Sequence, residues 1–242
     1  MKKFKFLLFG IALTVVTMFS SCMDDNTTPN TSIAYVTVAG GYLGTEYLIQ
    51  DIYGKRMIAP TASMVTYGLN AGDRAIIKFK LQDGFVASST TADWQIDILE
   101  CVKITSRNIL EKPIAGSAGD TLQNDSIVSF YAPYAYYGFP QVWAYNGYVT
   151  TGLVFYGGKY GYVDLVKDRI AKDTLYLNVN LNADKGSNTG LNNYSFYMPE
   201  RRVLLDGGIL PKNDSIIVAV SAKVADGTSY KYESKYWKYK LN

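Results

Sequence analysis

The sequence contains no histidine among its 242 residues. Histidine titrates near neutral pH, serves as the usual base for serine and cysteine nucleophiles, and is a common zinc ligand. Its absence excludes Ser-His-Asp and Cys-His catalysis, histidine-ligated zinc and a histidine pH switch. We therefore expect no enzymatic activity, no cofactor and no metal site. An enzyme that uses only carboxylates is the alternative left open.

Cysteine is also scarce, with only Cys22 and Cys101 present. Cys22 is expected to carry lipid, as argued below, so no intramolecular disulfide can form even though the protein is exported. Cys101 lies in a β-rich run and has no histidine partner. We interpret it as a buried, unreactive thiol.

The apolar stretch near the N-terminus is too short to cross a membrane. Residues 6–19 make 14 residues, whereas a spanning helix needs about 20. The stretch follows three lysines and ends in two serines, as secretory signals do. The next residue, Cys22, predicts a bacterial lipoprotein that is cleaved between Ser21 and Cys22 and acylated on Cys22.

The lipid would anchor the mature chain to a membrane. Residues 1–21 form the predicted signal peptide, and residues 22–32 form a flexible polar tether. Asp24 and Asp25 are similar to the acidic signal that directs Bacteroidota lipoproteins to the outer cell surface. We expect an outer-membrane lipoprotein at the cell surface, with the periplasmic face of that membrane as the alternative.

An excess of charge of one sign is lacking in the mature chain. The formal net charge is +3, and the three lysines of the signal peptide account for all of it. Nucleic-acid binding leaves a basic footprint, so we predict no nucleic-acid partner. The alternating Tyr and Lys residues at 230–240 are better explained as a final strand with lysines on its solvent side.

Tyrosine and glycine are abundant, with 21 residues of each. Together with period-two alternation and no long helical pattern, they predict an all-β fold. The strands expected in the first block are 33–39, 45–52, 56–58, 73–81 and 93–105. After a Pro- and Gly-containing boundary at about 106–123, those expected are 126–132, 141–145, 148–156, 174–181, 194–198, 215–224 and 229–241.

Turn residues and alternation add detail to this pattern. Asn146-Gly147 and Asp226-Gly227 predict hairpin turns, and the second block suits a β-sandwich. In 73–81, one face carries Ala75, Ile77, Phe79 and Leu81. In 93–105, alternation places on one face Trp94, Ile96, Ile98, Val102 and Ile104, with an interruption at Glu100.

Four segments resemble one family. They read Ser-Ser-Cys-Met-Asp-Asp at 20–25, Tyr-Leu-Ile-Gln-Asp-Ile-Tyr-Gly-Lys at 47–55 and Leu-Asn-Ala-Gly-Asp-Arg at 69–74, followed by the Tyr- and Lys-rich C-terminal hairpin. Together they are similar to the NigD-like lipoproteins of Bacteroidota. The resemblance implies an N-terminal OB-like barrel at 33–106, a C-terminal β-sandwich at 107–242 and an accessory or immunity role linked to bacteriocins. It assigns no catalytic residue.

Aromatic residues are densest between 130 and 148. Aromatic rings stack on sugars and anchor protein interfaces, because each offers a large rigid surface. The candidate ligand-binding set is Tyr134, Tyr136, Tyr137, Phe139, Trp143 and Tyr145. The alternative is that these rings only build a tyrosine-rich sandwich.

These observations predict a non-enzymatic, outer-membrane-anchored lipoprotein that binds or protects at the cell envelope. The expected partners are the membrane, through the lipid, and a glycan or an envelope protein. A glycan-binding accessory lipoprotein that uses the exposed aromatics is the alternative function.

Overall fold

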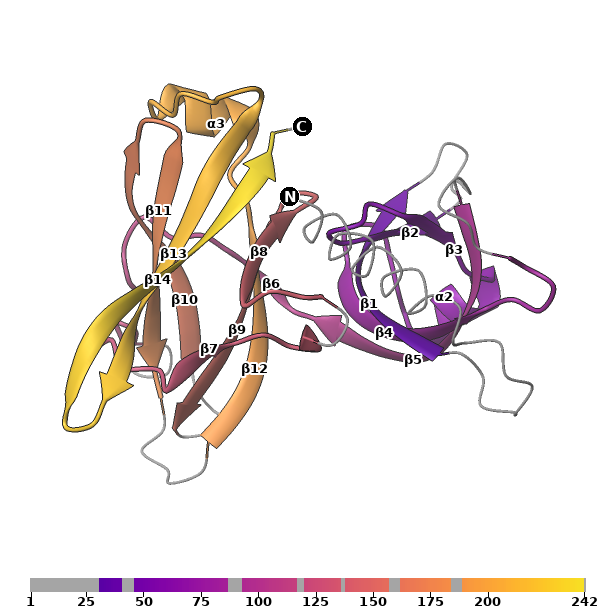
Figure 1. Ribbon diagram of the computed structural model, residues 1–242, viewed down its shortest axis with the longest axis horizontal. Coiled ribbons are helices and arrows are strands. Elements are labelled where there is room, and N and C mark those ends of the chain that lie inside the picture. Colours follow the sequence, from indigo (N-terminus) through magenta and orange to yellow (C-terminus); the bar gives the residue numbers. More distant parts are fainter. Residues whose placement is uncertain are drawn as a thin grey trace, which may run out of the picture.

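The computed structural model describes residues 31–40, 46–86, 93–116, 120–135, 138–156, 162–183 and 189–241. Within them the chain is almost entirely β and forms a closed barrel followed by a pair of sheets (Figure 1). The predicted all-β class is confirmed. Ser21 and Cys22 lie outside the described residues, so their roles stay predictions.

The barrel closes in the strand order β1-β2-β3-β5-β4. A single five-stranded closed barrel is the OB-like architecture that the resemblance implied. Its elements are β1 (Thr31–Gly40), β2 (Glu46–Gln50), β3 (Arg56–Ile58), helix α2 (Thr61–Thr66), β4 (Arg74–Leu81) and β5 (Asp93–Ile104). Apolar side chains that alternate along these strands fill its interior, among them Val36, Leu48, Met57, Ile77 and Ile96.

The predicted inward face of β5 is correct as far as Ile98 and wrong beyond it. In the pairing of β4 with β5, Lys78 lies opposite Glu100 but Phe79 lies opposite Ile98, so Leu99 is an extra, bulged residue. A bulge shifts all later side chains to the other face. Val102 is consequently 63% exposed, although alternation had placed it beside the buried Ile96 and Ile98.

The second domain is a β-sandwich. One sheet has the order β10-β11-β13-β14, and the other has the order β6-β12-β9-β7, with β8 also paired to β9. The strands of the first sheet are β10 (Tyr162–Ala171), β11 (Thr174–Asn182), β13 (Ser215–Asp226) and β14 (Ser229–Lys240). Those of the second are β6 (Ser106–Asn108), β7 (Ser129–Tyr131), β8 (Val142–Tyr145), β9 (Tyr148–Tyr156) and β12 (Thr189–Tyr197).

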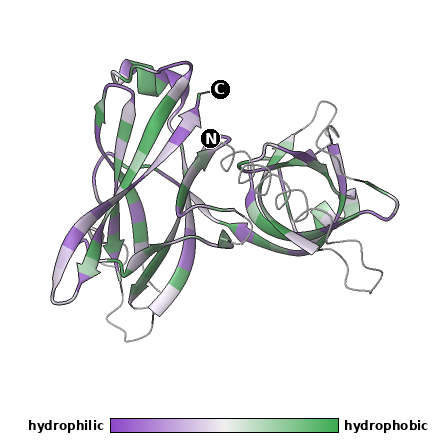
Figure 2. Ribbon diagram, in the orientation of Figure 1, coloured by the Kyte–Doolittle hydropathy of each residue, from purple (hydrophilic) through white to green (hydrophobic). Residues whose placement is uncertain are grey.

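The two sheets enclose one apolar core. Phe155, Leu165, Leu177, Phe196 and Val218 are buried in it, and polar residues alternate with apolar ones along the strands (Figure 2). Helix α3 (Arg201–Asp206) contributes Leu204 to this core. Among the described residues, no helix has the length and apolar content that crossing a bilayer requires.

Strand β10 was not predicted, because its outer face is covered. Val163, Asp164, Leu165 and Val166 are all buried, so the strand shows no alternation. On the outer face, Asp164 accepts a hydrogen bond from Thr121 Oγ1 at 2.8 Å, and Asn180 of the neighbouring strand donates to the Thr121 carbonyl. At its edge, β10 pairs with Leu110 through a backbone bridge at Val166. The segment that follows β6 therefore packs on β10 and hides its β pattern.

Candidate functional site

The contact between barrel and sandwich buries the outer face of β1. Ala34, Val36 and Val38 point into the barrel, whereas Tyr35 belongs to a separate cluster with the sandwich residues Phe139 and Trp143. Thr37, also on the outer face, is buried as well. We call this contact the domain junction; Figure 1 shows the barrel and the sandwich next to each other.

A charged pair lies at the centre of the domain junction. Arg74 Nη1 and Nη2 each donate to one oxygen of the Asp51 carboxylate at 2.6 Å. The exposed fractions of the two side chains are 1% and 0%. Arg74 also donates to Thr37 Oγ1 of the barrel at 2.8 Å and to Thr150 Oγ1 of the sandwich at 2.9 Å. The pair thus joins the two domains.

Aromatic rings surround this pair. Trp143 Nε1 donates to Asp51 Oδ2 at 2.9 Å, and the Trp143 ring lies edge-on to Tyr35 with centroids 4.9 Å apart. The ring centroids of Phe139 and Tyr35 are 4.8 Å apart. Tyr148 places its ring 4.8 Å from the Arg74 guanidinium and donates its hydroxyl to the Gly72 carbonyl. These contacts fix the orientation of the barrel on the sandwich.

Two of the predicted ligand-binding aromatics are therefore internal. Trp143 is 0% and Phe139 is 3% exposed. This corrects the expectation that both rings are available to a ligand. The physical reason is that the barrel covers both rings. It buries apolar surface that the sandwich alone would expose to water.

The other predicted aromatics lie nearer the surface. Tyr134 is 40% exposed, and its ring centroid lies 6.4 Å from that of Tyr35. Tyr145 is half-buried and lines a hollow of about 310 Å³ together with Trp237, Lys238 and Lys240 of β14. Tyr136 and Tyr137 lie outside the described residues. Ligand binding by Tyr134 and Tyr145 stays a prediction.

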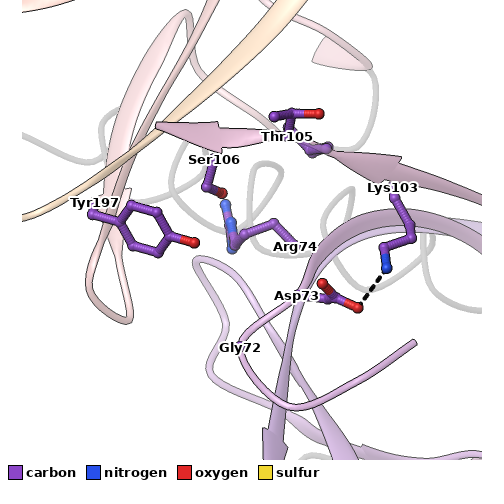
Figure 3. Close-up of a pocket in the computed structure, with 8 residues that line it drawn as sticks. Gly72, Asp73, Arg74, Lys103, Thr105, Ser106 and Tyr197 are labelled. Carbon is purple, nitrogen blue, oxygen red and sulfur yellow. Dashed lines mark ion pairs between the residues drawn. The ribbon is translucent and has the colours of Figure 1, made fainter. Parts of the chain in front are cut away.

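A second hollow, which we call the junction pocket, lies where the chain passes from barrel to sandwich. Its volume is about 260 Å³, and its lining includes Asp73, Arg74, Lys103, Ser106 and Tyr197 (Figure 3).

Three chain segments place these side chains. Gly72, with φ of 90°, ends the turn that precedes β4 and so positions Asp73 and Arg74. The end of β5 supplies Lys103, and the start of β6 supplies Ser106. β6 pairs in parallel with the end of β12, where Tyr197 lies.

The charges at the junction pocket are balanced. Lys103 Nζ lies 2.7 Å from Asp73 Oδ2. Partial burial opposes ionisation of Asp73, but hydrogen bonds from Lys103 and from the Asn70 backbone outweigh it and lower the Asp73 pKa. Asp73 is therefore a carboxylate at neutral pH, paired with Lys103, just as Asp51 is paired with Arg74.

Two buried polar atoms at the junction pocket have no partner among the described residues. Four of the five guanidinium N–H groups of Arg74 are hydrogen-bonded, but Nε is not, although it is buried. The buried hydroxyl oxygen of Ser106 is likewise unpartnered. In Figure 3 the guanidinium of Arg74 and the hydroxyl of Ser106 point toward each other.

Within the described ranges, no three acidic or cysteine side chains gather as they would at a metal site. Cys101 is a free thiol, half-buried against the barrel core, and burial raises its pKa. A raised pKa reduces the thiolate fraction and hence the reactivity.

Arg74, Asp51, Ser106 and Tyr197 were not proposed as site residues from the sequence. A signal did exist, because Asp51 and Arg74 each belong to one of the segments that resemble the NigD-like family. These two segments meet in the buried pair. The resemblance therefore rests in part on residues that hold the domains together.

Comparison with known proteins shows the fold. No protein-family model matches the chain, and no curated protein matches it in sequence. A solved candidate lipoprotein of Bacteroides fragilis is similar over 88% of this chain and 99% of its own, with a TM-score of 0.62 and 14% identity. A candidate toxin-related protein of Parabacteroides distasonis covers 87% of this chain and 94% of its own, with a TM-score of 0.58 and 19% identity.

A NigD-like immunity protein of Bacteroides caccae is also similar, over 90% of this chain and 100% of its own, with a TM-score of 0.49 and 13% identity. The solved structures thus include a protein named for the family that the sequence resembles.

Proposed function

We propose that the mature protein is a non-enzymatic, lipid-anchored protein of the bacterial envelope that binds or protects through its rigid two-domain body. The observation that carries this proposal is the junction pocket, a hollow of about 260 Å³ whose lining includes the ion-paired Arg74, Asp73 and Lys103 and the exposed Tyr197. A hollow lined by polar and aromatic side chains suits a bound polar ligand.

The side-chain chemistry supports binding over catalysis. The chain has no histidine. The buried carboxylate of Asp51 is occupied by Arg74 and Trp143, and that of Asp164 accepts a hydrogen bond from Thr121. Acids fixed in this way are poor proton donors and acceptors for a substrate.

The location rests on the N-terminal sequence and on the fold neighbours. Cys22 directly follows a short apolar signal, and a candidate lipoprotein is among the proteins of similar fold. We place the lipid anchor on Cys22 in the outer membrane, with Asp24 and Asp25 directing the body to the cell surface. If the protein protects the envelope, its role is the bacteriocin-associated, immunity-like one that the family resemblance implies.

Removal of the lipid attachment tests the anchoring. Cys22→Ser should move the protein from the membrane fraction to the soluble fraction without lowering the melting temperature, because Cys22 precedes β1, which begins at Thr31. Cys101→Ser in the same assay is the control and should stay in the membrane fraction. Retention of the Cys22→Ser protein in the membrane would contradict lipid anchoring.

The binding role needs its own measurement. The soluble Cys22→Ser mature protein, incubated with isolated cell envelopes of a Bacteroides species, should sediment with them. Hydrolysis of an envelope glycan or peptide that is abolished by changing one pair of acids would overturn the non-enzymatic proposal.

A further inference from the structure

We propose that the outer face of the β13–β14 hairpin docks an acidic protein partner. This inference rests on the proposed binding function and names the surface and the chemistry of the partner. We call this surface the hairpin face, and its large outward side chains are Lys223, Tyr230, Tyr232, Tyr236, Lys238 and Lys240.

The register of the hairpin determines which side chains share this face. In β13, Val218 and Val220 are buried in the core, so Ala219 between them points outward. Ala219 pairs with Tyr236 of β14, and paired residues lie on the same face of a sheet. The even-numbered residues of β14 therefore point outward. The sequence predicted lysines on the solvent side of this strand, and the structure adds three tyrosines to that side.

The three tyrosines are exposed and partly held in place. Tyr230, Tyr232 and Tyr236 are 55%, 65% and 62% exposed. The rings of Tyr230 and Tyr232 lie edge to face with centroids 6.0 Å apart, and Lys223 Nζ lies 4.3 Å from the centroid of Tyr230. Rings that neighbours hold lose little freedom on binding, and tyrosine is enriched among the residues that dominate protein interfaces.

The hairpin face carries positive charge only. Its lysines are Lys223, Lys238 and Lys240, and none of them forms an ion pair within the described part of the chain. The acids of the two strands, Asp226 and Glu233, occupy positions of the opposite face, where Glu233 pairs with a lysine. The adjacent outward positions of β11 are uncharged, namely Thr174, Tyr176 and Asn178.

This charge selects an acidic partner. The mature chain is formally neutral, so the hairpin face is a local excess of one sign. A second copy of the chain would bring the same charge to the contact, which disfavours self-association through this face. Carboxylates of another protein would pair with the lysines and accept hydrogen bonds from the tyrosine hydroxyls.

The extent and openness of the face suit a protein. β14 has 12 residues and is therefore about 40 Å long, enough to span one side of an interface that buries about 800 Å² per partner. Small ligands bind in concave sites, whereas this is the outer surface of a sheet. In Figure 1 the hairpin swings out to the left of the sandwich, away from the barrel.

An anionic glycan and an anionic lipid surface are the competing occupants. Segments that enter a lipid surface present exposed aliphatic or tryptophan side chains to the acyl boundary. The large exposed apolar side chains of β13 and β14 are all tyrosines, so the structure favours a protein over a membrane.

The test uses the soluble Cys22→Ser mature protein and isolated envelopes of a Bacteroides species in the sedimentation assay described above. The envelopes are used untreated, after protease digestion, and after periodate oxidation of their sugars. Phosphatidylglycerol vesicles are the lipid probe, and polygalacturonate in a calorimetric titration is the glycan probe. We expect binding to untreated and periodate-treated envelopes, loss of binding after protease digestion, and no binding of either probe.

Variants locate the surface. Tyr232→Ala and Lys238→Glu should each weaken binding to envelopes by about tenfold, as expected for a truncated interface residue or a reversed charge. The matched controls are Tyr156→Ala, at a 52% exposed tyrosine of β9, and Lys112→Glu, at an exposed position after β6. Both controls should bind as the wild type does. Melting temperatures verify that all four variants are folded.

Cross-linking identifies the charge of the partner. A photoreactive benzoylphenylalanine in place of Tyr230 should cross-link to an envelope protein with a negative net charge. The same residue in place of Tyr156 should not cross-link to that protein.

Four results would overturn the inference. They are binding that survives protease digestion, binding of the vesicles or of polygalacturonate that Lys238→Glu abolishes, cross-linking to a neutral or basic protein, and unchanged binding in both hairpin variants. If the wild type sediments with envelopes and the hairpin variants do so equally, the hairpin face is not the binding surface but the proposed function stands. If the wild type does not sediment, the proposed function fails and this inference fails with it.

Discussion

Arg74 and Asp51 illustrate what a buried ion pair contributes at the level of single residues. Removing two charges from water is unfavourable, and their mutual attraction only offsets this when further hydrogen bonds are present. Here Thr37, Thr150 and Trp143 provide those bonds. The pair therefore contributes mainly a defined geometry, because any other arrangement of the domains would remove its hydrogen bonds to Thr150 and Trp143 of the sandwich.

Asp73 predicts a pH-dependent contribution to stability. Its pKa is lowered in the folded state by Lys103 and Asn70, despite the opposing effect of burial. A group with a depressed folded-state pKa stabilises the protein above its unfolded-state pKa of about 3.9, and this contribution is lost as the pH falls through the folded-state pKa. Asp73→Asn should therefore lower the free energy of unfolding at pH 7 by about 0.2–1 kcal/mol.

Urea denaturation at pH 7 and at pH 3 measures this effect. The difference between wild type and Asp73→Asn should shrink at pH 3. Asp226→Asn, at an exposed position in the β13–β14 hairpin, should change little at either pH. If Asp73→Asn lowers the free energy of unfolding by the same amount at both pH values, the carboxylate charge does not cause the loss of stability.

At the level of elements, alternation identified most strands but failed at β10. This strand shows four consecutive buried residues because Thr121, in the segment after β6, bonds to Asp164 and Asn180 on its outer face. In β5, the bulge at Leu99 reverses the alternation partway along the strand. Neither event has a clear local signature, since each depends on what lies beside the strand.

Of the two predicted hairpin turns, one lies at the predicted residues and the other lies one position later. Asn146 and Gly147 lie between the paired residues Tyr145 and Tyr148, and both have positive φ, 47° and 85°. This is the type I′ turn that Asn-Gly predicts. In the last hairpin Asp226 pairs with Ser229, so the turn residues are Gly227 and Thr228, one position later than predicted.

The bond between Thr121 and Asp164 should hold the covering segment on β10. Thr121→Val removes the donor at 2.8 Å and leaves a buried carboxylate with one fewer partner, which should lower the free energy of unfolding by about 1–3 kcal/mol. Hydrogen exchange should also accelerate at the amides of Leu110 and Lys167, which bond across this contact.

Thr228→Val, in the exposed turn of the β13–β14 hairpin, is the matched control for this prediction. It makes the same chemical change without a buried partner. Unchanged exchange at Leu110 and Lys167 in Thr121→Val would mean that other contacts hold the segment.

At the level of the whole molecule, the domain junction should make barrel and sandwich unfold together. Asp51 belongs to the barrel, whereas Trp143 belongs to the sandwich. Asp51→Ala removes the shared acceptor and leaves Arg74 buried without its counter-charge. We expect a loss of about 3–5 kcal/mol and two separate transitions in scanning calorimetry where the wild type shows one.

Asp93→Ala is the control, because its ion pair with Arg56 spans 3.6 Å with side chains 40% and 48% exposed. Such pairs contribute at most about 1 kcal/mol, and the transition should stay single. A single transition with an equally small change in Asp51→Ala would show that the aromatic contacts alone couple the domains.

The sequence by itself determined the all-β class, most strand positions, one hairpin turn and the pattern around Cys22 that predicts a lipid anchor. These features are local, because alternation, turn residues and signal peptides are encoded in neighbouring residues. Only the tertiary structure decided which aromatics are covered and which polar groups meet. Arg74 and Asp51 are 23 residues apart in sequence, and Trp143 and Asp51 are 92 apart. No local pattern specifies contacts over such separations, so the domain junction and its pocket emerge only when barrel and sandwich pack together.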